Sequence, residues 1–334
     1  MQRSVAFFPL TLAALLLGFV VVVLGAYTRL SDAGLGCPDW PGCYGKLAVP
    51  EVAHEVLQAN ALYPDRPLHP GKAWKEMVHR YAAGTLGLVI LGLASLAWKN
   101  RHAAGQPVRA PMLLLALVVF QALLGMWTVT WLLKPIVVTA HLLGGMTILA
   151  ILFWLLLGQF FHGPAAPGTQ DRLLPWAVFG IIVLALQIFL GGWTSANYAA
   201  VICPEFPTCR AGEWWPGPDF AEGFVFWRGL GVDYEGGVLG AAARTAVHLA
   251  HRVGALVTVL VLLAVAVRAL FGQGRSARVT GCVVLVLVCM QAGLGIANVL
   301  MVRPLPVAVA HNAVAALLLL SLVALLHSAC VRRR

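Results

Sequence analysis

Long apolar stretches alternate with short polar ones along the whole chain. A stretch of roughly 20 apolar residues is long enough to cross the hydrocarbon core of a bilayer as a helix. Eight stretches meet this requirement, at about 7–28, 76–98, 111–131, 136–161, 173–194, 244–270, 277–300 and 307–328. The pattern predicts an all-α integral membrane protein with eight transmembrane helices.

Two parts of the chain carry the same polar signals in the same order. The segment "GAYTRLSDAGLGCPDWPGC" at 25–43 pairs with "GWTSANYAAVICPEFPTC" at 192–209. An "HR" pair follows each of them, at His79 and at His251. Such self-similarity indicates an internal repeat.

The later part of the repeat keeps its spacing. "QALLGMWTV" begins at Gln121 and "QAGLGIANV" at Gln291, and each glutamine stands 20 residues before a histidine, His141 or His311. We therefore predict two tandem four-helix bundles, in residues 1–165 and 166–334. Because four spans are an even number, both halves enter the membrane in the same direction, and a pseudo-two-fold axis along the membrane normal relates them.

Charge sets the expected orientation. The chain is 60% hydrophobic and 11% charged, with a net charge of +10. Lys and Arg gather on one side of the predicted membrane, at Arg3, Lys99, Arg101, Arg109, Arg172, Arg268, Arg275, Arg278 and Arg332 to Arg334, against Lys134 and Arg303 in the opposite short loops. By the positive-inside rule both termini face the cytoplasm, and segments 29–75 and 195–243 lie outside. The excess of Lys and Arg is therefore explained by membrane topology, and we expect the lipid bilayer, and no nucleic acid, as the partner.

Four histidines lie inside the predicted helices, near the outer ends of the even-numbered ones: His79, His141, His251 and His311. An ionisable residue in a transmembrane segment indicates a functional site. Two facing histidines in a four-helix bundle can supply both axial ligands of a haem, which predicts one haem site in each half. A hydrogen bond to a backbone carbonyl is the structural alternative for any one of them.

Zinc is the competing metal, since His248 or Glu76 precedes a predicted ligand by three residues and shares its helix face. Arg80 and Arg252 directly follow His79 and His251. Each guanidinium is expected either to hold a haem propionate or to reach towards the membrane surface.

Seven cysteines divide by position. Cys37 with Cys43 and Cys203 with Cys209 lie in the outer segments, where an oxidising compartment favours two short-loop disulfides. The remaining three, Cys282, Cys289 and Cys330, lie in or near helices and are expected to be small apolar fillers. The aromatic stretch 210–243 is expected either to lie on the outer membrane surface or to cap the second haem.

These features together resemble the heme A synthase family: tandem four-helix halves, "EMVHR" in the first, "HR" in the second, later "AH" histidines and paired outer-loop cysteines. The resemblance implies an oxidoreductase of the bacterial inner membrane that converts haem O to haem A for a terminal oxidase, by successive hydroxylation of the porphyrin C8 methyl group to a formyl group. It implies that His251 and His311 ligate a haem b cofactor. It also implies that His79 and His141 hold the haem O substrate.

The resemblance extends to the residues beside these ligands. Arg252 is placed with the cofactor and Arg80 with the substrate, and the Cys37–Cys43 pair matches the family's outer-loop disulfide. Haem O synthase, an electron partner that the sequence does not identify and a second copy of the chain are the candidate protein partners.

Glu76 matches the acidic residue that the family has beside the substrate site. The repeat makes it distinctive, because His248 takes its place in the second half. A carboxylate here can accept a proton or stabilise positive charge during oxidation of a methyl group. An ordinary ion pair with Arg80 at i,i+4 is the alternative.

Two other functions are compatible with parts of the pattern. A di-haem membrane electron carrier of the cytochrome b kind, working between quinol and a periplasmic acceptor, needs the same histidine pairs but two permanently bound haems. A transporter is disfavoured because the sequence shows neither a midplane charge nor a pair of broken helices.

Overall fold

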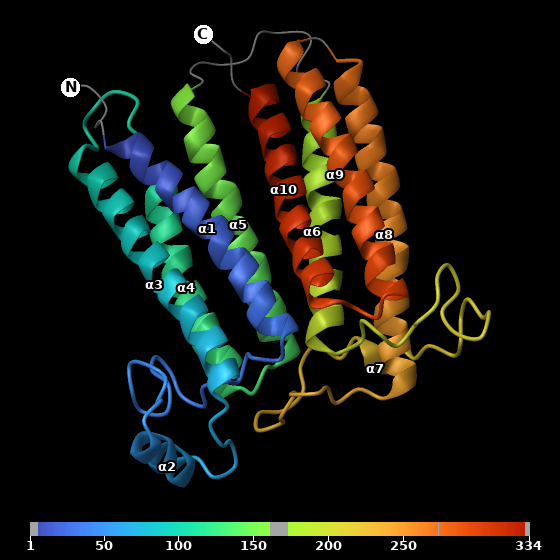
Figure 1. Ribbon diagram of the computed structural model, residues 1–334. Helices are drawn as coiled ribbons and strands as arrows, with labels where there is room; N and C mark the ends of the chain where they lie inside the picture. The colour runs from blue at the N-terminus through green and yellow to red at the C-terminus, as the bar shows by residue number, and fades with distance from the viewer. Residues whose placement is uncertain (1–5, 161–172, 273, 331–334) are drawn as a thin grey trace.

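The computed structural model describes residues 6–160, 173–272 and 274–330 and is drawn in Figure 1. Its long helices are α1 Phe7–Leu30, α3 Pro70–Lys99, α4 Arg109–Thr130, α5 Pro135–Phe160, α6 Leu174–Ala196, α8 Ala241–Leu270, α9 Arg275–Leu300 and α10 Leu305–Cys330. Two short helices, α2 Ala53–Leu62 and α7 Phe220–Gly223, lie between them. The described residues form isolated bridges but no strand.

All eight long helices are long and apolar enough to cross a membrane, which confirms the predicted spans. The protein is therefore a multi-pass membrane protein. The largest difference concerns α3, which begins at Pro70 and not near residue 76. Proline suits the first turn of a helix because that turn leaves backbone N–H groups without partners inside the helix, so α3 starts in the polar segment before its apolar run.

The long helices form two groups (Figure 1), and their mutual contacts close each group into a ring. In the first ring α1 contacts α3 and α5, and α4 contacts the same two helices; in the second, α6 and α9 each contact α8 and α10. The rings meet through α1 with α10, α5 with α6, and α5 with α10. Such reciprocal contacts are compatible with a two-fold relation, but the tandem arrangement and its axis stay a prediction. The proposed boundary at 165–166 lies outside the described residues.

α10 is the most buried of the spanning helices. In its most apolar window 56% of the residues are buried, against 11% in α9. Leu318, Leu322 and Leu325 lie in its buried face, and α10 contacts helices of both rings. The junction between the two rings is therefore built around the last helix of the chain.

The helix ends separate into two sets. α1 begins and α10 ends at one end of the molecule, whereas both cysteine segments, α2 and α7 lie at the other (Figure 1). This agrees with the relative placement expected from charge. Arg3, Arg172 and Arg332 to Arg334 lie outside the described residues, and the side of the membrane that each end faces stays a prediction.

The expectation that Cys282, Cys289 and Cys330 fill the core is wrong, because all three are exposed. Cys282 and Cys289 belong to α9, the spanning helix with the smallest buried share, so most of its surface is left to face lipid. Their small apolar side chains are suited to that environment as well.

Candidate functional site

The structure brings the four predicted ligand histidines together in two pairs. His79 of α3 and His141 of α5 stand on helices that are diagonal in the first ring, and His251 of α8 and His311 of α10 are placed in the same way in the second. Within each pair the two imidazoles are close enough to interact electrostatically. Each ring therefore holds two imidazoles that can act on one ligand.

Each of these imidazoles lies against a glycine of a neighbouring helix. A Cβ atom placed on Gly25, Gly125, Gly191 or Gly295 would lie 3.0, 3.5, 3.3 and 3.3 Å from Cε1 of His79, His141, His251 and His311, respectively. A side chain at Gly25, Gly191 or Gly295 would crowd the imidazole, whereas at Gly125 the Cβ atom would make an ordinary contact. The glycines thus make room for the histidine rings.

A haem fits this arrangement. The Nδ1 atoms of His79, His141 and His311 are buried and have no hydrogen-bond partner. An unpaired buried polar atom costs free energy and calls for an explanation. Two histidines per ring, three of the four with an unpaired ring nitrogen, match the bis-histidine ligation of a haem iron.

Zinc has less support from the same residues. A zinc site requires three or four ligands, and no cluster of three or more His, Cys, Asp or Glu side chains that could hold a metal ion occurs in the part of the chain that the structure describes. His248, named as a third ligand, is buried and its Nδ1 lies 2.8 Å from the carbonyl oxygen of Ala199. It is therefore engaged with the outer segment.

Three glutamines belong to the sites although the sequence analysis gave them no role. Gln121, Gln187 and Gln291 each stand four residues before the glycine that faces a histidine. Nε2 of Gln187 lies 3.0 Å from Nδ1 of His251, and Nε2 of Gln291 lies 3.2 Å from Nε2 of His311. The recurring spacing Gln-x-x-x-Gly is the sequence signal that could have found them.

The fourth position of this motif breaks the symmetry. Val21 stands four residues before Gly25, where the second half has Gln187 before Gly191. His79 pairs with the backbone of Val21 and lacks the side-chain amide that lies beside His251. The two histidine sites therefore differ in the kind of neighbour that one of their imidazoles has.

Arg80 and Arg252 fasten the cysteine segments in the structure. Arg80 donates from Nη1 to the carbonyls of Asp39, at 2.9 Å, and of Gly42. Arg252 donates to the carbonyls of Thr208 at 2.8 Å and Glu205 at 2.7 Å. This contact was not among the expected roles, because it depends on how the disulfide segment folds back over the helix.

Glu76 is also tied to the first cysteine segment. It is buried, its Oε2 accepts a hydrogen bond of 2.9 Å from the backbone N–H of Cys37, and its Oε1 pairs with Nη2 of Arg80. The ion pair named as the alternative to catalysis is thus present. It does not exclude a further role, since a carboxylate can accept several hydrogen bonds.

Both predicted disulfides are present, Cys37–Cys43 and Cys203–Cys209, which confirms that expectation. In the aromatic stretch 210–243, Phe224 and Phe226 pack against Trp193 of α6, whereas Trp214 and Trp215 are exposed. One part of this stretch therefore covers the second ring and another part faces outward.

Known proteins resemble this chain over most of its length. Residues 9–323 match the family described as cytochrome oxidase assembly protein. The heme A synthase of Shewanella oneidensis is 46% identical over 305 residues, which cover 91% of each chain. The heme A synthase of Rhizorhabdus wittichii is 31% identical over 333 residues, covering 91% of this chain and 88% of the relative.

A third relative, the heme A synthase of Caulobacter vibrioides, is 28% identical over 343 residues and covers 95% of this chain. The family match spans both rings, both cysteine segments and all four site histidines. This chain therefore belongs to the heme A synthase family.

Proposed function

We propose that this protein is a heme A synthase, an oxidoreductase that converts the C8 methyl group of haem O to a formyl group by successive hydroxylations. The observation that carries the proposal is the 46% identity with the heme A synthase of S. oneidensis over 91% of both chains. The two histidine pairs, each beside its glycines, support it because they offer one place for a substrate haem and one for a haem cofactor.

The proposal assigns a different haem to each ring. His251 and His311, with Arg252 nearby, hold haem b, and His79 and His141, with Arg80 nearby, hold haem O. The contact of the Gln187 side chain with His251 supports this assignment, because a hydrogen-bonding neighbour helps to orient a ligand histidine and the first ring has only the backbone of Val21 at that place. A permanent cofactor gains from such support, whereas a substrate must leave.

The chain's own residues would position the substrate. His79 and His141 fix the haem O iron between α3 and α5, and the glycines beside them let the porphyrin approach the helices. Bound haem b supplies one-electron redox chemistry. Glu76 lies three residues before His79 on the same helix face, and its carboxylate takes up a proton or stabilises positive charge at the methyl carbon.

The role of Glu76 is tested by Glu76→Gln. The amide keeps the size of the side chain but cannot act as a base, so haem binding should persist while turnover falls by roughly 10²- to 10⁴-fold. Haem O or a hydroxylated intermediate should accumulate in extracts. Wild-type turnover in this variant would leave Glu76 only its contacts with Arg80 and Cys37.

We place the protein in the bacterial cytoplasmic membrane, with both termini in the cytoplasm and the disulfide segments in the periplasm. Charge asymmetry supports this orientation. Haem O synthase, an electron partner and a second copy of the chain remain the proposed protein partners.

The function is tested by purifying the protein and identifying its extracted haems by mass. Haem B together with haem O or haem A is expected. Replacing His251 or His311 by Ala should remove haem B, whereas replacing His79 or His141 should stop haem A formation and leave most haem B. Two permanently bound haems B and no haem A would instead favour the di-haem electron carrier.

A further inference from the structure

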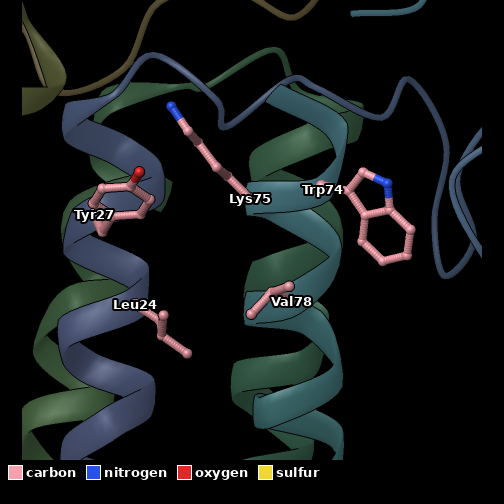
Figure 2. Close-up of a pocket in the computed structure, with 5 residues that line it drawn as sticks. All are labelled: Leu24, Tyr27, Trp74, Lys75 and Val78. Carbon is pink, nitrogen blue, oxygen red and sulfur yellow. The ribbon is translucent and has the colours of Figure 1, made fainter. Parts of the chain in front are cut away.

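A pocket of about 220 Å³ lies between α1 and α3. Its walls are formed by Leu24, Tyr27, Trp74, Lys75 and Val78. Figure 2 shows Leu24 and Val78 extending into the space between the two helices, with Lys75 reaching across nearer the helix ends towards Tyr27. The Lys75 ammonium lies 5.3 Å from the centre of the Tyr27 ring.

The pocket lies near His79 along both helices, although His79 is not among the residues that line it. Gly25, the residue that faces His79, stands between Leu24 and Tyr27 in the sequence of α1, and Val78 directly precedes His79 on α3. Val78 is 44% exposed, so the pocket opens on the outer surface of the helix pair. Within a membrane that surface faces lipid.

At the equivalent place in the described part of the second ring, the corresponding residues are covered. The repeat aligns Tyr27 with Trp193 and Lys75 with Val247, and both of these residues are buried. Nε1 of Trp193 donates a 2.9 Å hydrogen bond to the carbonyl oxygen of Gly223. A Cβ atom on Gly223 would lie 3.3 Å from Val247, so the chain passes directly over α8.

Phe224 and Phe226 complete this cover. Their ring centres lie 6.5 and 5.1 Å from that of Trp193. We call residues 223–226 the aromatic plug. In the first ring the residues that line the pocket come from α1 and α3 alone, so the outer segment supplies no corresponding plug.

We propose that the pocket between α1 and α3 binds the isoprenoid chain of the substrate haem, and that the aromatic plug closes the equivalent space beside the cofactor haem. This inference rests on the proposed function. Haem O differs from haem B in carrying a long apolar hydroxyfarnesyl chain on the porphyrin edge. A site for haem O needs an apolar space that continues beyond the porphyrin, and a site for haem B does not.

The walls of the pocket suit such a chain. Leu24, Val78 and the ring of Tyr27 present apolar surface, and burial of apolar surface favours binding. Lys75 places a charge at the end of the pocket nearer the helix ends, which disfavours apolar groups there. The chain therefore runs past Leu24 and Val78 towards the middle of the membrane, where any part longer than the pocket meets lipid.

The test compares haem O with haem B as ligands of the purified full-length protein that carries its cofactor haem. Both share the porphyrin and the propionates, but haem B lacks the isoprenoid chain. The dissociation constant of each is measured by absorbance titration for the wild type and for Leu24→Trp, which fills the pocket. Val78→Trp fills it from the opposite wall, and Leu88→Trp, at a 70% exposed position on α3 outside the pocket, is the matched control.

The wild type and Leu88→Trp should bind haem O more tightly than haem B. Burial of each methylene is worth about fourfold in affinity, so excluding three or four should weaken haem O binding by roughly 60- to 250-fold. Haem B binding at the first site should stay unchanged in Leu24→Trp and Val78→Trp. Retained cofactor haem in every variant verifies that the protein is folded.

Unchanged preference for haem O in both pocket variants would overturn the inference, as would an equal loss of haem O and haem B affinity. A wild type that binds haem O and haem B equally would overturn it as well, while leaving the proposed function intact. Failure of the wild type to bind haem O at all would instead refute the proposed function.

Discussion

Replacing Gly25 by alanine adds one methyl group against the imidazole of His79. The new Cβ atom would lie 3.0 Å from Cε1, closer than nonbonded carbon atoms normally approach, so the ring must move by a few tenths of an ångström. Overpacking of this kind typically costs about 1–3 kcal/mol. If the cost falls on the ligand-binding position of His79, haem O affinity drops by roughly 5- to 150-fold.

Other effects of the substitution oppose this loss. Alanine is favoured over glycine inside a helix by about 1 kcal/mol, so α1 itself should not be weakened. Gly84→Ala on α3 gives the matched control, because a Cβ atom there meets nothing within 4 Å. Gly125→Ala should have an intermediate effect, since its Cβ atom would lie at an ordinary contact distance of 3.5 Å from His141.

The assay is an absorbance titration of haem O into each purified variant, with haem b content measured in parallel. We expect the loss of affinity to follow the order Gly25, Gly125, Gly84, with haem b unchanged throughout. Equal affinities for Gly25→Ala and Gly84→Ala would refute the view that this glycine makes room for the ligand histidine.

Three more predictions concern the second ring and the outer segments. Gln187→Leu removes a hydrogen bond of His251, and because such a bond contributes roughly 1 kcal/mol, haem b should dissociate about fivefold faster. Val21→Leu in the first ring should leave the rate of haem b dissociation unchanged. Stopped-flow transfer of haem to apomyoglobin measures both rates. The four outer-segment cysteines should resist alkylation until the protein is reduced. The three helix cysteines should react in detergent without reduction. Peptide mass mapping after alkylation measures both. Hydrogen bonds from the backbone N–H of Gly212 and neighbouring donors hold the pKa of Glu205 below its ordinary value of 4.5. The ionised Glu205 carboxylate therefore stabilises the folded loop above pH 4.5, and this stabilisation is lost as pH falls through the folded-state pKa of Glu205. Amide exchange at Gly212, corrected for the intrinsic rate, should therefore accelerate in acid, and Glu205→Gln should abolish that dependence.

Hydrophobicity was sufficient to predict the eight spans, because a bilayer demands long apolar helices whatever their packing. The repeat also predicted which histidines share a ring, since equal spacing places His141 and His311 at matching positions. Their glycine neighbours were not predicted. A glycine in an apolar helix gives no sign of which side chain will lie against it.

Contacts that depend on the outer segments were the hardest to predict. Arg80 and Arg252 bind carbonyls whose positions are set only when each disulfide segment folds over its helix. The aromatic plug was expected only as one of two alternatives for a long stretch, because Phe224 and Phe226 have no periodic pattern that would indicate their partner Trp193. Local sequence contains little information on such long-range packing.

The central burial of α10 has a consequence for how the protein is made. α10 leaves the ribosome after all the helices that it contacts, and these belong to both rings. Until it inserts, the faces of α1, α5 and α6 that receive it are exposed to lipid, and the second ring lacks His311. The second ring and most of the junction therefore wait for this helix, since a chain stopped after α9 would keep only the contact of α5 with α6 between the rings and would lack His311, a proposed haem ligand.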